Sequence, residues 1–353
     1  MIPKYNKVHN KFKLNNYHYT SDSLMEVAYS FVKEGDDYEK EMGNFLLDWM
    51  DDNDYVEVNT SGSTGKPKRI KLDKQAMVYS AIATGDFFGL KPGDSALHCL
   101  PANYIAGKMM LVRAIVLGLE IDVVTPTSYS LDSAYRASYD FCAMVPMQLE
   151  NSLVNINRIK KLIVGGTAVP KHLIDAIQKI PTQVYETFGM TETITHIAAR
   201  PLNHVSAPQH FKVFPNVTIS KDDRGCLVID APHLNADNIV TNDVVEIYST
   251  KEFKILGRAD NVINSGGVKL FPEVIESKLE SQIQSRFFVA SEKDDFLGHA
   301  LVLVTEGKQE IDINSFEGLD KYEMPKHVYY VDAFVETETK KIKRRETLEL
   351  IKK

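Results

Sequence analysis

Residues 55–73 have the sequence YVEVNTSGSTGKPKRIKLD, in which two short runs, YVEVNT and RIKLD, flank a loop of Gly, Ser, Thr, Lys and Pro. The two runs predict strands. Glycine lets a backbone approach a ligand closely, and amide and hydroxyl groups donate to phosphate oxygens. Lys66 and Lys68 add positive charge. The loop at 60–68 is therefore a candidate phosphate-binding loop, and a flexible surface turn is the alternative that its composition leaves open.

The spacing of this loop differs from that of the Walker phosphate-binding loop. Gly62 and Gly65 lie too close together for that pattern. Pro67 follows Lys66 where a Ser or Thr would bind magnesium. The sequence therefore disfavours a P-loop kinase or GTPase.

The composition is that of an ordinary globular protein, with 353 residues of which 44% are hydrophobic and 25% charged. Such a length predicts two domains. A formal net charge of −7 makes the chain a poor binder of nucleic acid, so an anionic ligand must be held by local basic groups. The three cysteines are widely spaced and suggest neither a disulfide framework nor a zinc motif.

The sequence predicts neither a signal peptide nor a membrane span. The N-terminus lacks an apolar core. The most apolar stretch, MMLVRAIVLGLEIDVV at 109–124, is interrupted by Arg113, Glu120 and Asp122. We interpret this stretch as a core helix followed by a buried strand, and we expect a cytoplasmic protein.

Strand and helix patterns alternate along much of the chain. Helices are expected at 23–33, where Ser23 and Glu26 form a capping-box pattern, and at 38–50, 73–88 and 106–118. Short apolar runs predict strands in SALHCLP (95–101), IDVVTP (121–126), FCAMVP (141–146) and KLIVGG (161–166), and the last two each precede a helical stretch. This alternation predicts an α/β fold with helices on both faces of a sheet.

The pattern changes after about residue 194. Segment 194–257 consists mostly of short strands with turn signals, and GRADNVINSGG at 257–267 is loop-like. A helix that begins at Pro272 then opens a smaller α+β unit. We therefore expect a large domain at 1–259, with helix-covered sheets and a β-rich subdomain, and a small domain at 260–353.

Several motifs follow the loop: VGGTAVP at 164–170, FGMTET at 188–193, TNDVVEI at 241–247, GRAD at 257–260 and KIKRR at 341–345. In this order they resemble the acyl-adenylate-forming superfamily of acyl-CoA synthetases, luciferases and peptide-synthetase adenylation domains. The resemblance begins near residue 55, and only 59 residues precede the loop, fewer than in full-length relatives. It implies a ligase that uses ATP, Mg²⁺ and coenzyme A, with a mobile C-terminal domain that carries the catalytic lysine.

The resemblance implies a role for individual residues. Phe188 would stack on adenine in place of the commoner Tyr, Thr191 would contact the α-phosphate, and Glu192 would hold Mg²⁺. Asp243 and Arg258 would bind the ribose hydroxyls, and Asp260 would lie at the hinge between the domains. The other implied nucleotide contacts are Thr60, Ser61, Gly62, Ser63, Thr64, Gly65, Lys66, Lys68, Gly165, Gly166, Gly189 and Lys269.

The C-terminal motif departs from the family pattern. Aligning KIKRR places the catalytic lysine at Lys341, but Lys340 stands where the family has Gly and Val335 where it has Pro. This departure leaves open whether Lys340 shares the role. It also motivates an alternative of a different class, a nucleotide-binding regulatory protein that has lost catalysis.

The acid is indicated by LPANYIAGKMMLVRA at 100–114, which most resembles o-succinylbenzoate–CoA ligases of menaquinone biosynthesis. Tyr104 falls at the aromatic position that flanks the acyl pocket. That substrate keeps a second carboxylate after activation, and its pocket should hold a cation or several donors because a buried unpaired charge is very costly. Lys108 and His196 are the candidates, against a snorkelling lysine and an ordinary strand histidine.

Two further points stay open at the level of sequence. A ligase for another small acid or aryl acid, serving coenzyme A or a carrier protein, is the alternative to o-succinylbenzoate activation. The sequence does not determine the oligomeric state, and a homodimer is one option.

Overall fold

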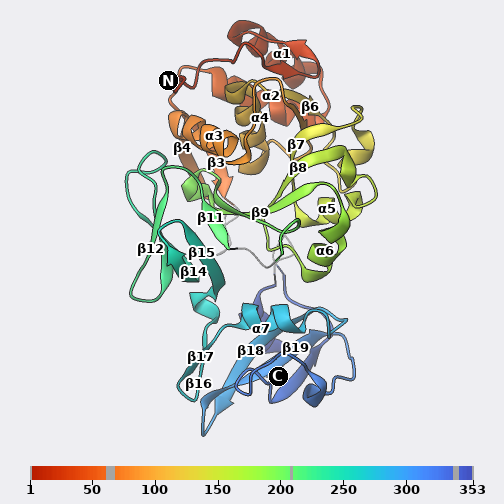
Figure 1. Cartoon of the computed structure of the whole chain (residues 1–353), viewed down its shortest axis with the longest axis vertical. Coiled ribbons are helices and arrows are strands. Elements are labelled where there is room, and N and C mark those ends of the chain that lie inside the picture. Colours follow the sequence, from red (N-terminus) through yellow and green to blue (C-terminus); the bar gives the residue numbers. More distant parts are fainter. Residues whose placement is uncertain (1, 61–67, 207–209, 337–341, 352–353) are drawn as a thin grey trace. The chain divides into compact units, whose positions relative to one another are not determined.

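The computed structural model describes residues 2–60, 68–206, 210–336 and 342–351 (Figure 1). The chain divides into two compact units. The first comprises 1–219, 229–239 and 248–252, and the second comprises 220–228, 240–247 and 253–353. In the described part of the chain, none of the helices combines the length and the apolar character that crossing a membrane requires.

The helices of the first unit are α1 (Ser21–Glu34), α2 (Asp37–Met50), α3 (Lys74–Phe88), α4 (Ile105–Leu117), α5 (Pro146–Ser152) and α6 (Lys171–Ala176). The helices predicted at 38–50, 73–88 and 106–118 are thereby confirmed. The prediction that Ser23 and Glu26 cap the first helix is wrong. Thr20 is the N-cap, because its side chain accepts from the Ser23 N–H at 3.3 Å while its own N–H donates to Ser23 Oγ at 2.8 Å.

The first unit contains a mixed sheet with the strand order β11-β10-β9-β8-β7-β5-β6-β1-β2. Its strands are β1 (Lys13–Leu14), β2 (Tyr17–His18), β5 (Ser95–His98), β6 (Glu120–Val123), β7 (Tyr139–Met144), β8 (Ile159–Val164), β9 (Gln183–Gly189), β10 (His196–Pro201) and β11 (Phe211–Val213). The run β6-β5-β7-β8-β9 is parallel, and β10 pairs antiparallel with β9. Loops that follow the parallel strands therefore gather at one edge of the sheet, where α/β proteins usually bind ligands.

Helices cover both faces of this sheet. Leu162 of β8 belongs to a buried cluster with Leu149 of α5 and Leu173 of α6, and α5 and α6 lie beside β8 in Figure 1. On the opposite face, Phe141 of β7 packs against Phe88 of α3 with ring centroids 5.9 Å apart. The α/β architecture predicted from the strand and helix patterns is confirmed.

A separate hairpin carries the first motif. β3 (Tyr55–Thr60) pairs antiparallel with β4 (Lys68–Asp73), and Thr60 lies opposite Lys68. Both strands predicted around the loop are therefore present.

Strands β12 (Thr218–Lys221), β13 (Cys226–Asp230), β14 (Ile239–Ser249) and β15 (Glu252–Arg258) are neighbours in this order. The two compact units share the residues of these strands. The β-rich character predicted for 194–257 is confirmed.

The second unit then continues with β16 (Ile263–Ser265), β17 (Val268–Leu270), α7 (Pro272–Leu279), β18 (Phe287–Asp294), β19 (Gly298–Glu306), β20 (His327–Val331) and α8 (Arg344–Ile351). Strands β18 and β19 are antiparallel, and β20 is parallel to β19. Leu303 packs in the cluster that contains Ile275 of α7, and its neighbour Val304 packs in the cluster flanked by Leu348 of α8. The helix predicted to begin at Pro272 is confirmed.

Short 3-10 turns complete the described elements. They are Ser130–Ser133, Ile156–Arg158, Ile177–Lys179, Thr191–Thr193, Ala259–Asn261 and Ile313–Ser315.

Candidate active site

The FGMTET motif occupies the end of β9 and the turn that follows it. Phe188 is half-buried in β9, and Gly189 lies opposite His196 of β10. A Cβ on Gly189 would lie 2.2 Å from the Thr195 carbonyl oxygen, so only glycine allows this close approach. Thr191 is half-buried and Glu192 is exposed in the 3-10 turn. Within the described residues, no hydrogen bond or ion pair engages the Glu192 carboxylate, so it is available to a cation.

The VGGTAVP motif leaves β8 directly beside that turn, because β8 and β9 are parallel neighbours. Gly166 has a φ of +92°, which favours glycine. The segment is held from β9: the Val169 N–H donates to Glu186 Oε1 at 3.0 Å, and Arg200 Nε donates to the other Glu186 oxygen at 2.6 Å. The predicted contacts Gly165 and Gly166 thus lie at the same edge of the sheet as Phe188.

In the second unit, the two residues predicted to bind ribose are in contact. Arg258 Nη1 donates to Asp243 Oδ1 at 3.1 Å, and Asp243 is largely buried. Asp260, the predicted hinge residue, is exposed and accepts from Asn242 Nδ2 at 2.5 Å. Lys269 lies exposed in β17.

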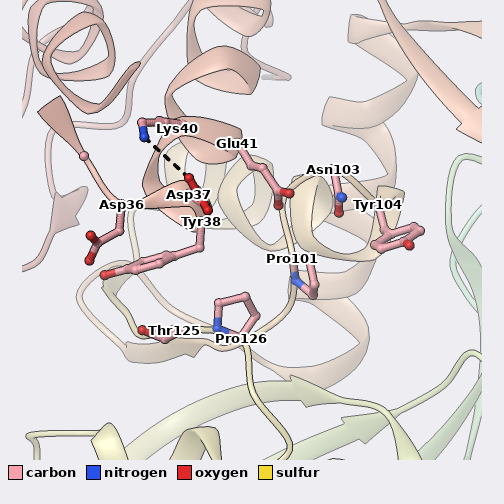
Figure 2. Close-up of a pocket in the computed structure, with 11 residues that line it drawn as sticks. Asp36, Asp37, Tyr38, Lys40, Glu41, Pro101, Asn103, Tyr104, Thr125 and Pro126 are labelled. Atoms are coloured by element: carbon pink, nitrogen blue, oxygen red, sulfur yellow. Dashed lines mark hydrogen bonds and ion pairs between the residues drawn. The ribbon is translucent and has the colours of Figure 1, made fainter. Parts of the chain in front are cut away.

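Two predicted substrate contacts face α2. Tyr104 precedes α4, is 54% exposed, and lines a cavity of about 570 Å³ together with residues 35–38, 40 and 41 around the start of α2 (Figure 2). Lys108 of α4 is 9% exposed, and its Nζ lies 4.7 Å from the centroid of the Phe45 ring. Burial lowers the pKa of Lys108, against the opposing influence of Asp48 and Glu41. Lys108 lines a separate cavity of about 220 Å³.

The third predicted substrate contact lies elsewhere. His196 Nε2 is 3.0 Å from Thr84 Oγ1 in α3 and 3.4 Å from Arg113 Nη2 in α4. Burial, and secondarily the Arg113 charge, hold the pKa of His196 well below its usual range. His196 is therefore a neutral group beside a buried cation. The structure does not bring Lys108 and His196 together.

Arg113 is the residue that motif reasoning missed. It is 1% exposed, and its Nε donates to Thr84 Oγ1 at 3.3 Å. Among the described residues, no carboxylate lies within 4.0 Å of its guanidinium nitrogens, and the two side chains that contact it, Thr84 and His196, are neutral. Burial lowers its pKa to about 9. The sequence signal was present, because Arg113 interrupts the most apolar stretch of the chain.

Part of the predicted site lies outside the described residues. These residues are Ser61, Gly62, Ser63, Thr64, Gly65, Lys66 and the predicted catalytic Lys341. Thr60 ends β3 and Lys68 begins β4, which fixes where the loop leaves and re-enters the hairpin.

The donor set fits magnesium bound together with a nucleotide. The described residues contain no group of three or more His, Cys, Asp or Glu side chains that could hold a metal alone. Mg²⁺ in nucleotide enzymes usually takes one or two carboxylates and completes its shell with phosphate oxygens and water. The exposed Glu192 carboxylate, in the turn after β9 and beside the segment that leaves β8, meets that requirement.

A family model described as AMP-binding enzyme matches residues 21–233. The chain belongs to this family. It is an ATP-dependent ligase that forms acyl-adenylates, within the acid–CoA ligase (AMP-forming) group.

Two comparisons with individual proteins agree with this assignment, and a third shows the same fold. A crystal structure from Dyadobacter fermentans, of an acyl-CoA synthetase (AMP-forming)/AMP-acid ligase II-like protein, is 36% identical with a TM-score of 0.64, covering 93% of this chain and 98% of that one. The 2-succinylbenzoate–CoA ligase of Bacillus cytotoxicus is 26% identical over 83% of this chain and 69% of its own length. The o-succinylbenzoate coenzyme A synthetase of Bacillus subtilis, solved with ATP and magnesium ion, has a TM-score of 0.71 at 22% identity, covering 83% and 69%.

Proposed function

We propose that this ligase activates o-succinylbenzoate and transfers it to coenzyme A, the reaction of menaquinone biosynthesis. The observation that carries the choice of acid is the buried guanidinium of Arg113 without a carboxylate partner among the described residues. The 2-succinylbenzoate–CoA ligases that the chain resembles at 26% identity support the same choice.

The electrostatics of Arg113 favour an acid with two carboxylates. A buried cation without an opposite charge is costly, and a substrate carboxylate would supply that charge. o-Succinylbenzoate has two carboxylates, so one remains anionic after the other is joined to AMP. The guanidinium has five N–H donors, and contacts with Thr84 and His196 leave several for a carboxylate. Arg113 therefore replaces Lys108 and His196 in the proposal as the group that recognises the second carboxylate.

The nucleotide end of the proposal uses the motif residues. Phe188 stacks on adenine between the segments that leave β8 and β9, while Asp243 and Arg258 bind the ribose hydroxyls. Thr191 contacts the α-phosphate, and the 60–68 loop cradles the phosphates. Glu192 would hold Mg²⁺, which neutralises phosphate charge when it is bound.

The chemistry needs little more than positioning and electrostatic stabilisation. A carboxylate oxygen of the acid attacks the α-phosphorus, and pyrophosphate leaves with the electrons of the broken P–O bond. The Lys341 ammonium stabilises the negative charge that develops on the phosphoryl oxygens. The thiol of coenzyme A then loses its proton and attacks the acyl carbon, and AMP leaves. In this proposal the small domain, 260–353, rotates at Asp260 between the two steps.

A substrate panel in the acid-dependent ATP–pyrophosphate exchange assay tests this proposal. We expect o-succinylbenzoate to support exchange with a higher kcat/KM than fatty acids or simple aryl acids. Exchange with those acids and none with o-succinylbenzoate would show that the acid is wrong. Nucleotide binding without exchange for any acid would favour the regulatory alternative.

A further inference from the structure

The turn that carries Thr191 and Glu192 is fixed from within by a buried threonine. Thr193 is 0% exposed. Its Oγ1 accepts from the Met190 N–H at 3.0 Å and lies 2.6 Å from the Thr195 carbonyl oxygen and 2.9 Å from that of Met190. A single hydroxyl thus ties the residue before the turn to the residue after it.

The backbone immediately after Thr193 is strained. Ile194 has φ +67° and ψ −57°, and the Thr195 N–H donates to the Thr193 carbonyl oxygen at 2.7 Å. These values define the rare form of γ-turn, which is unfavourable for a β-branched residue. Ile194 is only 2% exposed, so its side chain is anchored in the core. Such strain persists only where surrounding contacts enforce it, and it is concentrated at functional sites.

In the strained turn, some residues of the FGMTET motif and the following Ile194 face the protein interior and others face solvent. Thr193 and Ile194 point into the protein, whereas Glu192 is exposed and Thr191 is half-buried. On the N-terminal side of the turn, Gly189 lies directly against the backbone of Thr195 and His196. This close contact restricts movement of the turn on that side. Removing the Thr193 hydroxyl would leave the partly buried Met190 N–H without this acceptor and let the turn relax.

We propose that Thr193 is a positioning residue for adenylation, whose hydroxyl holds the strained turn so that Thr191 and Glu192 meet the α-phosphate and Mg²⁺. This inference rests on the roles of Thr191 and Glu192 in the proposed function. It is independent of which acid the enzyme activates, because Thr193 acts through the nucleotide and the metal.

The test compares Thr193→Val, which keeps the shape and removes the hydroxyl, with Thr193→Ser, which keeps the hydroxyl. ATP–pyrophosphate exchange is measured with the best acid of the panel while Mg²⁺, ATP and the acid are varied separately. We expect Thr193→Val to lower kcat by about 10- to 100-fold, as a displacement near 1 Å does. The Mg²⁺ concentration for half-maximal rate should rise several-fold, the KM for the acid should change little, and Thr193→Ser should restore both properties.

Two further variants keep the result decisive. Thr193→Ala replaces Thr193→Val if circular dichroism shows that the latter is unfolded. Glu192→Ala is measured in parallel and should raise the Mg²⁺ requirement. If it does and a folded hydroxyl-free variant does not, the positioning role of Thr193 is wrong while the proposed function stands. If Glu192→Ala leaves the Mg²⁺ requirement unchanged, the metal role of Glu192 is wrong and the inference falls with it.

Discussion

Replacing Arg113 by methionine should stabilise the protein and weaken its use of o-succinylbenzoate. Methionine is unbranched and uncharged, although it is shorter than arginine. Burial removes water from the guanidinium and lowers the pKa of Arg113 to about 9. At about 1.4 kcal/mol for each pKa unit, the buried cation costs roughly 5 kcal/mol relative to a hydrated one. The contacts with Thr84 and His196 offset part of that cost.

We therefore expect Arg113→Met to raise the free energy of unfolding by about 1–3 kcal/mol at pH 7, in line with other replacements of buried charges by apolar groups. Below pH 9, Arg113 is charged in both the folded and the unfolded wild-type protein, so the gain should be constant there and shrink as the pH rises above 9. In the wild-type structure Thr84 Oγ1 and His196 Nε2 lie 3.0 Å apart, so each side chain has a hydrogen-bond partner besides Arg113. Urea unfolding at several pH values measures the change.

The catalytic consequence has the opposite sign. A substrate carboxylate that loses a desolvated guanidinium partner loses about 2–4 kcal/mol, which is roughly 30- to 1000-fold in kcat/KM. 4-Oxo-4-phenylbutanoate has the skeleton of o-succinylbenzoate without the ring carboxylate, so its kcat/KM should be nearly unchanged. Lys108→Met, which removes another buried cation from α4, discriminates between the two sites. Destabilisation of the protein by Arg113→Met, or loss of the preference for o-succinylbenzoate in Lys108→Met but not in Arg113→Met, would refute the role assigned to Arg113.

Three further predictions concern other residues. Burial lowers the pKa of His98 from 6.5 to about 4, so as the pH falls the unfolded state binds a proton before the folded state does. The free energy of unfolding should therefore fall by about 3 kcal/mol between pH 6.5 and 4. In urea titrations His98→Leu should flatten this pH dependence, and an unchanged slope would contradict the prediction. Lys341→Ala should abolish most pyrophosphate exchange and largely spare thioester formation from supplied acyl-adenylate. If Lys340→Ala has these effects and Lys341→Ala does not, Lys340 is the catalytic lysine. Asp243→Asn should raise the KM for ATP by about 10-fold, at 1.4 kcal/mol for one weakened charged hydrogen bond, and leave the KM for the acid unchanged; equal changes in both would argue against a ribose contact.

Local patterns in the sequence predicted the elements well where one physical signal dominated. The alternation of apolar runs predicted the strands at SALHCLP and KLIVGG, and Pro272 predicted the start of α7. The cap of α1 was misplaced because Thr20 and Ser23 satisfy the same hydrogen-bonding pattern as Ser23 and Glu26, three residues apart. Choosing between such overlapping signals requires the backbone angles of the N-cap, which the sequence does not contain.

The substrate end of the site was harder to predict, for a reason visible in α4. All residues from Gly107 to Val116 are buried, so the helix has no polar face that would show which side meets which neighbour. Motif position placed Lys108 and His196 in one pocket. In the fold, Lys108 packs on Phe45 of α2 while His196 meets Arg113 and Thr84. Only the tertiary contacts show that Lys108 and His196 lie in different surroundings.

The most direct test of the central claim is the wild-type ATP–pyrophosphate exchange rate with o-succinylbenzoate and with 4-oxo-4-phenylbutanoate, measured side by side. The two acids differ only in the carboxylate that we assign to Arg113. We expect exchange that depends on o-succinylbenzoate, with a kcat/KM at least about 30-fold above that of the analogue, or about 2 kcal/mol at 1.4 kcal/mol per tenfold. Equal kcat/KM values for the two acids, or exchange with the analogue alone, would contradict it.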